Sequence, residues 1–302
     1  MVKKSRFNWL QQDWHIVRSY ALGHERRPLL ASCKLTYRCN LQCRQCPFHQ
    51  MEGPTPSFPE VVATLQRLCQ RGNRLVVFEG GEPMLWRDGA WSIRDVVAEA
   101  KKLFFCVGLT TNGTFPLDIE TDVLWVSLDG LADTHNRLRG AGVFEQALAH
   151  IRQSAHPKIL AHITVNAVNC DEVPDLIRYL RGVVRGVTLQ FYYPYHRRDE
   201  LFLDFDRRER LLEQVLALKR AGYPVLNSTA ALEALKRNRW QCVDWLMDNA
   251  NPGGTLTQGC YLRGRDDIDC ARCGFSPHTE ISLAYQHNLH AVRAGIEIFF
   301  RR

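Results

Sequence analysis

The chain has 302 residues, enough for one large α/β domain with an additional segment. Its 45% hydrophobic and 24% charged residues are average for globular proteins and exclude a disordered or fibrous class, and no run reaches the ~18 apolar residues that a membrane-spanning helix needs. The formal net charge of +7 suits an anionic partner, but the arginines are dispersed without interleaved aromatic residues, so we expect a solvated basic surface and no nucleic-acid partner.

Residues 1–27 are the first predicted element, an amphipathic helix. Phe7, Leu10, Trp14 and Val17 recur at helical spacing, and basic residues lie off that stripe. No apolar run ending in small residues follows the basic start, so we expect no secretory signal and a cytoplasmic location, where eleven cysteines stay reduced. The helix either docks on the main domain or touches the inner face of the membrane.

From residue 28 onward, β-branched or aromatic runs alternate with helical patterns, which is typical of βα units and a parallel sheet. The predicted strands span residues 29–35, 75–79, 104–109, 123–128, 159–165 and 187–191. The clearest helices span residues 59–70, 91–102, 144–151, 173–181 and 207–219. We therefore predict an α/β fold, a partial (β/α)6 TIM-like barrel over residues 28–225, with ligands bound by the loops after the strands.

Three cysteines follow the first predicted strand, at Cys39, Cys43 and Cys46. Three thiolates within eight residues can bind three corners of a four-iron cubane and leave one iron open for a substrate or cofactor. A structural zinc site is the alternative, but such a site normally has four ligands, and no second Cys-x-x-Cys pair lies nearby in sequence.

The second predicted strand leads into Gly80, Gly81, Glu82 and Pro83. Two glycines allow the main chain to approach a ligand closely, and a carboxylate at a strand end can pair with an ammonium group. Alone, these four residues would be an ordinary turn.

Polar residues also follow the remaining strands. Each taken singly is a turn or cap residue; their order and position count. The residues are Asn112 after the third strand, Ser127, Asp129, His135, Arg139 and Phe144 at and after the fourth, and Asn166 and Gln190 at the fifth and sixth.

The Cys-x-x-x-Cys-x-x-Cys spacing after a first strand resembles the signature of the radical S-adenosylmethionine (SAM) superfamily, and residues 80–83 resemble its GGEP motif. The resemblance implies an enzyme with a [4Fe-4S] cluster on Cys39, Cys43 and Cys46, whose open iron binds SAM. It also implies one-electron cleavage of SAM to a 5′-deoxyadenosyl radical. The electron would come from a low-potential donor of the flavodoxin or ferredoxin type.

The same resemblance assigns the SAM contacts. Residues 80–83 would hold the amino group, Ser127 and Arg139 the carboxylate, and Asp129 would shape the ribose side. One departure concerns Gln45, because superfamily members often have an aromatic residue before the third cysteine, where it helps to hold adenine. Phe48 or a backbone amide would then make that contact.

Residues 226–302 form a smaller region that carries Cys242, Cys260, Cys270 and Cys273. Four cysteines can close a second [4Fe-4S] cluster or a zinc site, and an unmetallated core is the third alternative. Short patches around these cysteines resemble the tail of the radical SAM enzymes that join an adenosyl group to a hopanoid precursor. We expect this region to cover the substrate.

Three functions remain open. The first is hydrogen abstraction from, or adenosyl addition to, an isoprenoid or lipid-like substrate, which the tail resemblance and the amphipathic start favour. The second is modification of a ribosomal peptide or small metabolite, with an auxiliary cluster on the C-terminal cysteines. The third is a non-enzymatic metal-binding module for nucleic acid, which leaves residues 80–83 and the strand order unexplained.

Overall fold

The computed structural model describes residues 26–194, 199–262 and 268–301. The helix predicted for residues 1–27 lies outside this part of the chain, apart from Arg26 and Arg27, so its docking or membrane role stays a prediction. Among the helices that are described, none has the length and apolar character needed to cross a bilayer.

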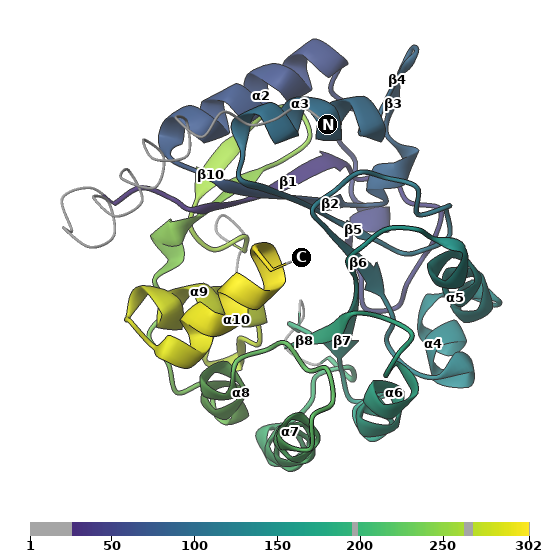
Figure 1. Ribbon diagram of the computed structural model, residues 1–302, viewed down its shortest axis with the longest axis vertical. Coiled ribbons are helices and arrows are strands. Elements are labelled where there is room, and N and C mark those ends of the chain that lie inside the picture. Colours follow the sequence, from purple (N-terminus) through teal and green to yellow (C-terminus); the bar gives the residue numbers. More distant parts are fainter. Residues whose placement is uncertain (1–25, 195–198, 263–267, 302) are drawn as a thin grey trace.

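A curved eight-stranded sheet dominates the structure, with strand order β10-β9-β1-β2-β5-β6-β7-β8 (Figure 1). The six predicted strands are all present, each within two residues of the expected bounds, and they pair in parallel as expected. They are β1 (Leu30–Thr36), β2 (Leu75–Gly80), β5 (Cys106–Thr111), β6 (Val123–Ser127), β7 (Ile159–Val165) and β8 (Gly186–Phe191). The α/β, partial-barrel fold class is therefore confirmed.

Helices cover the outer face of this sheet (Figure 1). The predicted ones are α2 (Phe58–Arg71), α3 (Ile93–Leu103), α5 (Val143–Gln153), α6 (Val173–Tyr179) and α7 (Phe205–Arg220). Helix α3 begins later than predicted because a short hairpin of β3 (Arg87–Asp88) and β4 (Trp91–Ser92) precedes it, and Ser92 with Asp95 forms its capping box. Within the described ranges, the α-helices that were not predicted are α4 (Ala132–Arg139), α8 (Thr229–Lys236), α9 (Ser276–Tyr285) and α10 (Leu289–Phe299).

The C-terminal region joins the sheet at its first strand. Strand β9 (Met247–Ala250) pairs in parallel with β1, and β10 (Leu256–Gln258) pairs antiparallel with β9. Asp248, which is fully buried, accepts hydrogen bonds from Arg71 Nε at 2.7 Å and Asn73 Nδ2 at 2.7 Å, and so ties β9 to the segment between α2 and β2. Strands β9 and β10 thus extend the barrel wall, and the role of residues 226–302 as a separate lid remains a prediction.

Helix α10 closes the amino end of the barrel. Ile298 packs against Leu30, Leu75 and Leu160, residues at or near the start of their strands, in an apolar cluster distinct from the main core. Lys158 Nζ donates to the carbonyl of Glu297 at 2.8 Å and so caps the end of this helix. Among the described residues, α10 thus fills the amino end of the barrel, so we expect a substrate to approach from the carboxyl ends of the strands.

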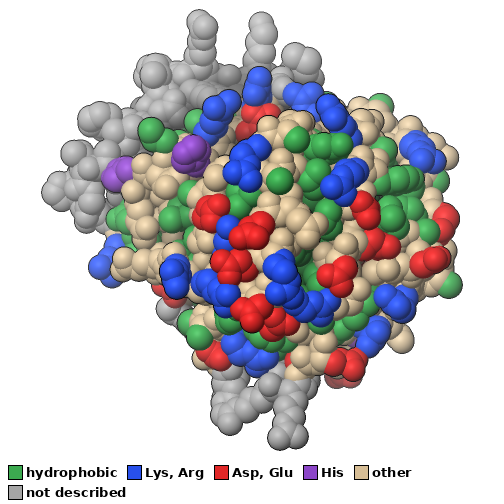
Figure 2. All heavy atoms as spheres, turned by 90° about the horizontal axis from the view of Figure 1, so that it is seen from below, with side chains coloured by type: hydrophobic (Ala, Val, Ile, Leu, Met, Phe, Trp, Pro, Cys, Tyr) green, Lys and Arg blue, Asp and Glu red, His purple; other side chains and the backbone are tan. Residues whose placement is uncertain are grey.

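The molecular surface seen from the side of α7 carries charges of both signs, interspersed (Figure 2). Arg237 pairs with Asp206 at 2.8 Å and with Glu209 at 2.6 Å, and Lys236 pairs with Glu233 at 2.9 Å. Neighbouring charges of α7 and α8 are therefore paired with one another, in exposed pairs that each contribute little to stability.

Candidate active site at the carboxyl ends of the strands

The loop after β1 brings Cys39, Cys43 and Cys46 together. Leu41 N donates to Cys39 Sγ at 3.4 Å, and Cys46 N donates to the Cys43 carbonyl at 3.1 Å. Burial raises the pKa of Cys43 to about 11, the Arg139 guanidinium opposes that rise, and the Cys46 and Cys39 thiols add to it. The three thiols are therefore near neighbours, and a bound metal centre would displace their protons.

The donor set fits a four-iron cluster. Within the described ranges, no three His, Cys, Asp or Glu side chains are grouped as the ligands of one metal ion. A cubane makes a different demand, because each thiolate binds its own iron. Three thiols on one loop can thus hold such a cluster and leave one iron for another ligand.

Gly80 and Gly81 allow the β1 and β2 loops to touch. Gly81 N donates to the Thr36 carbonyl at 2.8 Å, and Glu82 N donates to the Arg38 carbonyl at 2.9 Å. A Cβ at position 81 would lie 2.2 Å from the Arg38 carbonyl oxygen, and Gly80 has a φ of +124°. The close approach that the sequence predicts is thus made to the cysteine loop itself, which these bonds fix in place.

Glu82 is a buried carboxylate that accepts hydrogen bonds from neutral donors, and no ion pair with it forms in the part of the chain that the structure describes. Its Oε1 accepts from Thr111 Oγ1 at 2.8 Å and from Met84 N at 3.1 Å, and its Oε2 accepts from Asn112 N at 2.8 Å. Burial nevertheless raises the pKa of Glu82 to about 7. The hydrogen bonds and the more distant Arg139 charge lower this pKa, but burial outweighs them. The ammonium group of SAM would supply the missing positive charge, so this residue fits the assigned contact.

Asn112 connects the Glu82 loop to the cluster loop. Its Nδ2 donates to Asn40 Oδ1 at 2.9 Å and lies 3.9 Å from Cys39 Sγ. Its Oδ1 accepts from Thr114 N at 2.9 Å. The residue therefore positions Cys39 as well as lying beside the proposed SAM site.

Asp129 and Arg139 form a buried ion pair at 2.6 Å. Gln45 Nε2 donates to the same Asp129 oxygen at 2.6 Å, and Thr164 N donates to the other at 2.8 Å. Protein donors thus reach both Asp129 oxygens, and the role of Asp129 on the ribose side of SAM stays a prediction. The Arg139 charge also acts on Cys43 and Cys46, so this last residue of α4 lies close to the cysteine loop.

Gln45 stands directly before the third cysteine, where the resemblance implies an aromatic residue. Its Oε1 is buried and has no hydrogen-bond partner among the described residues, so it offers an acceptor beside the site. Phe48, the alternative adenine support, stacks on Tyr37 with ring centres 5.9 Å apart. The adenine contact stays a prediction, with Gln45 as an added candidate.

The remaining predicted residues have different surroundings. Ser127 is buried on β6 beside His162 of β7, on the inner face of the sheet. The Asn166 oxygen accepts from Val168 N at 2.9 Å and closes the turn after β7, whereas its Nδ2 is buried without a partner in the described chain. Gln190 pairs in register with Thr164 near the end of β8.

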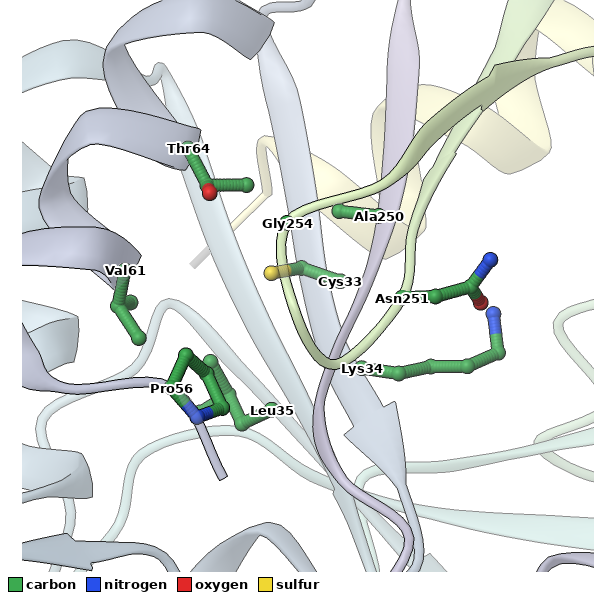
Figure 3. A pocket seen from close by; sticks show the side chains of 9 residues that line it. All are labelled: Cys33, Lys34, Leu35, Pro56, Val61, Thr64, Ala250, Asn251 and Gly254. Carbon is green, nitrogen blue, oxygen red and sulfur yellow. The ribbon is translucent and has the colours of Figure 1, made fainter. Parts of the chain in front are cut away.

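Sequence reasoning missed an ion pair on the inner face of β1 and β2. Lys34 Nζ donates to Ser32 Oγ at 3.0 Å and lies 3.4 Å from Glu79 Oε1, and Ser32 Oγ donates to the same carboxylate. Figure 3 shows that the Lys34 side chain extends away from that of Cys33, its neighbour in β1. Cys33 lines a small pocket between β1 and α2. The signal was the strand alternation, which places Ser32 and Lys34 on one face.

The four C-terminal cysteines converge, although they come from separate segments. Burial of its thiol raises the pKa of Cys242 to about 12, and after Asp244 the next contributions come from Cys273, Cys260 and Cys270. Cys260 and Cys273 pack against a cluster of Tyr193, Leu262 and Phe275. The turn that carries the last two cysteines is fixed to the sheet, because Phe191 N at the end of β8 donates to the Gly274 carbonyl at 2.9 Å.

The chain is similar in sequence to several known proteins. It is 25% identical over 268 residues to a probable GTP 3′,8-cyclase of Pyrococcus abyssi, covering 78% of this chain and 85% of that one. It is 28% identical over 158 residues to a pre-heme d1 synthase of Dinoroseobacter shibae, where the match spans 48% of this chain and only 38% of the relative.

Solved structures share the fold. Streptococcus suis SuiB bound to S-adenosylmethionine superposes with a TM-score of 0.65 at 13% identity, over 97% of this chain and 71% of SuiB. The peptide-bound structure of anSMEcpe with AdoMet gives 0.60 at 16% identity, over 88% and 82%. The family model of the radical SAM superfamily matches residues 33–180, the span from β1 to α6 that carries the cysteine loop and the Glu82 and Asp129 contacts. With these matches and this geometry, the chain belongs to the radical SAM superfamily and is an enzyme, and its family implies a [4Fe-4S] cluster and SAM as cofactors.

Proposed function

We propose that this radical SAM enzyme modifies a polar substrate, a peptide or a small metabolite, and that its C-terminal cysteines bind a second [4Fe-4S] cluster. The observation that carries the proposal is the polarity of the inner face near the carboxyl ends of the strands. The residues there are Ser32, Lys34, Glu79, Ser127, His162, Thr188 and Gln190. An isoprenoid or lipid-like substrate, our first expectation, would take these polar groups out of water, including the 36% exposed Glu79 carboxylate, without offering them hydrogen bonds in return.

The ion pair is the centre of this surface. The Lys34 side chain is 3% exposed, whereas that of Glu79 is 36% exposed, so the carboxylate is the partner that faces the open interior. Lys34 also lies under the Tyr261 ring, 5.7 Å from its centre, and this contact supports the proposal that the C-terminal region covers the substrate. A substrate with hydrogen-bond donors, such as amide or amino groups, would match Glu79.

Two histidines add neutral polar groups. Burial lowers the pKa of His162 to about 4, with Arg139 adding to the fall while Asp129 and Glu79 oppose it. Burial likewise lowers the pKa of His278 to about 4, and its Nδ1 is buried without a partner in the described chain. At neutral pH both rings are therefore uncharged and can donate or accept one hydrogen bond at each nitrogen.

The cofactors would be held as the site geometry suggests. Cys39, Cys43 and Cys46 would bind the first cluster, Glu82 the ammonium of SAM, and Arg139 its carboxylate. When bound, the cluster and SAM supply a carbon radical through one-electron reductive cleavage. The protein's own part would be placement and exclusion of water. Helix α10 packs at the amino end of the barrel, and the segment around Tyr261 would cover the carboxyl ends of the strands.

The names of the compared proteins are compatible with a polar substrate. GTP 3′,8-cyclase is named for a nucleotide, and the anSMEcpe structure contains a bound peptide. The proposal is therefore a polar substrate as a class, with peptide and metabolite as its two forms.

The test compares extracts as sources of substrate. The reconstituted enzyme is given SAM, dithionite and either an aqueous metabolite extract, a peptide fraction or a chloroform lipid extract, and 5′-deoxyadenosine is measured. We expect stimulation by one of the two polar fractions, and weaker stimulation in a Glu79→Gln variant. Stimulation by the lipid extract alone would contradict the proposed substrate class. For the second cluster, we expect about eight irons per chain, falling to about four in a Cys39/Cys43/Cys46 triple alanine variant.

A further inference from the structure

Arg208 is a buried cation at a position where helix α7 presents its apolar face. Its side chain is 0% exposed and lies on the same helical face as Leu211, Leu212 and Val215, which belong to the main core. The guanidinium lies over the Phe191 and Phe205 rings, with centres 4.2 and 4.8 Å away. An arginine at such a position needs a compensating partner.

The polar contacts of Arg208 all lead to the C-terminal cysteine turn. Its Nη1 donates to the Cys273 carbonyl at 3.0 Å and to Asn238 Oδ1 at 3.2 Å. Asn238 Nδ2 in turn donates to the Ala271 carbonyl at 2.8 Å, so both residues hold the turn between Cys270 and Cys273. Asn238 adopts a φ of +51° at this bridge, a conformation that asparagine tolerates better than most residues.

The charge of Arg208 is not matched by a carboxylate in the described chain. Its Nε and Nη2 are buried and have no hydrogen-bond partner there. The other deeply placed arginine, Arg139, pairs with Asp129 at 2.6 Å, and the next residue, Arg207, pairs with Asp171 at 3.0 Å. Aromatic faces offset part of the cost of burying a cation, but a buried charge is stable mainly when an opposite charge lies near it.

We propose that the missing anion is the C-terminal four-iron cluster and that Arg208 is its counter-charge, a positioning residue that stabilises the four thiolates and raises the reduction potential of the cluster. This inference rests on the proposed second cluster. Four thiolates around a [4Fe-4S] core carry a net charge of about −2, which becomes more negative when the cluster accepts an electron. A cation beside it therefore favours the reduced state.

The experiment isolates the second cluster. A Cys39/Cys43/Cys46 triple alanine background retains only the C-terminal cysteines as proposed ligands. In it we compare Arg208→Met, Arg208→Gln and Arg208→Lys with Arg207→Met, a matched control one residue away on the same helix. Iron and sulfide are counted after anaerobic reconstitution, and the midpoint potential is obtained by dithionite titration followed by electron paramagnetic resonance.

We expect both neutral variants to shift the reduction equilibrium about tenfold toward the oxidised cluster, which is ~59 mV for a one-electron couple. The Lys variant should keep most of the original potential, and the Arg207 control all of it. If Arg208→Met does not fold, the Gln and Lys pair still separates charge from packing. Unchanged potentials in the neutral variants would overturn the role of Arg208 alone, whereas a background protein without iron, or with zinc only, would overturn the second cluster as well.

Discussion

The two cysteine sites are built in opposite ways. The first uses three cysteines of one loop, held by backbone hydrogen bonds to Gly81 and Glu82, and its arginine is neutralised by Asp129. The second gathers four cysteines from separate segments, and in the described chain its arginine, Arg208, has no paired carboxylate. The difference teaches that hydrogen bonds and an ion pair within the chain organise the first site, whereas under our proposal the second site would depend on the charge of a bound cluster.

Removing the Asp129 carboxylate should have the largest effect, because it converts the first site into one with an unpaired arginine. We expect Asp129→Ala to lower the free energy of unfolding by about 3–5 kcal/mol, since Arg139 would remain buried and uncompensated. Urea unfolding of the apo protein measures this. The control is Asp175→Ala, which removes an exposed pair with Arg178 and should cost at most ~1 kcal/mol. Equal losses in the two variants would show that the buried pair is not special.

The glycine junction of the first site gives the next largest effect. Gly81→Ala would force a Cβ against the carbonyls of Tyr37 and Arg38, so we expect a loss of about 2–3 kcal/mol and less iron bound at the first site. Gly295→Ala is the matched control, because nothing lies within 4 Å of its Cβ in α10 and alanine favours a helix. Thermal unfolding should therefore move in opposite directions for the two variants.

Glu82 tests the cofactor contact of the first site without changing its cysteines. We expect Glu82→Gln to weaken SAM binding about 10- to 100-fold, the loss of one charge-assisted interaction, while the iron content stays constant. Anaerobic calorimetry measures the affinity, and Glu60→Gln, in the exposed capping box of α2, should leave it unchanged. Wild-type affinity in the Glu82 variant would remove this residue from the SAM site.

The smallest effect concerns Glu280, a glutamate of the C-terminal region that resembles Glu82 in its surroundings. Burial raises the pKa of Glu280 to about 7 although its Oε1 accepts from Ser228 N at 2.7 Å. Between pH ~4.5 and ~7 the folded state therefore holds more protons than the unfolded state, so stability falls as pH rises through this window. Glu280→Gln should remove that share of the fall, on the order of 1–2 kcal/mol, in unfolding curves at pH 5 and pH 8. Parallel pH profiles for the two proteins would contradict it.

Much of the fold could be predicted from the sequence because its signals are local. Strand patterns in the βα units predict β1, β2, β5, β6, β7 and β8 to within two residues at each end, whereas the short β3 and β4 were missed. Strands β9 and β10 could not be predicted in this way, since they are short and depend on β1 and on the contacts of Asp248 with Arg71 and Asn73. Helix α4 was missed because its sequence is mostly polar and lacks a clear apolar stripe. Its last residue, Arg139, pairs with Asp129 instead of packing in the core.

The candidate site follows the same rule. The residues after consecutive strands could be found by spacing, since parallel strands end at one edge of the sheet. Lys34 and Glu79 were missed because a pairing across two strands requires the register, and Arg208 because its partner lies about 65 residues away in sequence, at Cys273. Contacts between residues so far apart in sequence depend on how the elements pack, and a local sequence pattern does not predict that packing.

The most direct test of the whole account is the fate of SAM at the first cysteine site. Purified without oxygen, reconstituted with iron and sulfide, and mixed with SAM and dithionite, the protein should release 5′-deoxyadenosine or an adenosylated product, and the Cys39/Cys43/Cys46 triple alanine variant should release neither. A wild-type protein that carries its full iron content yet leaves SAM intact under these conditions would contradict the assignment of this site.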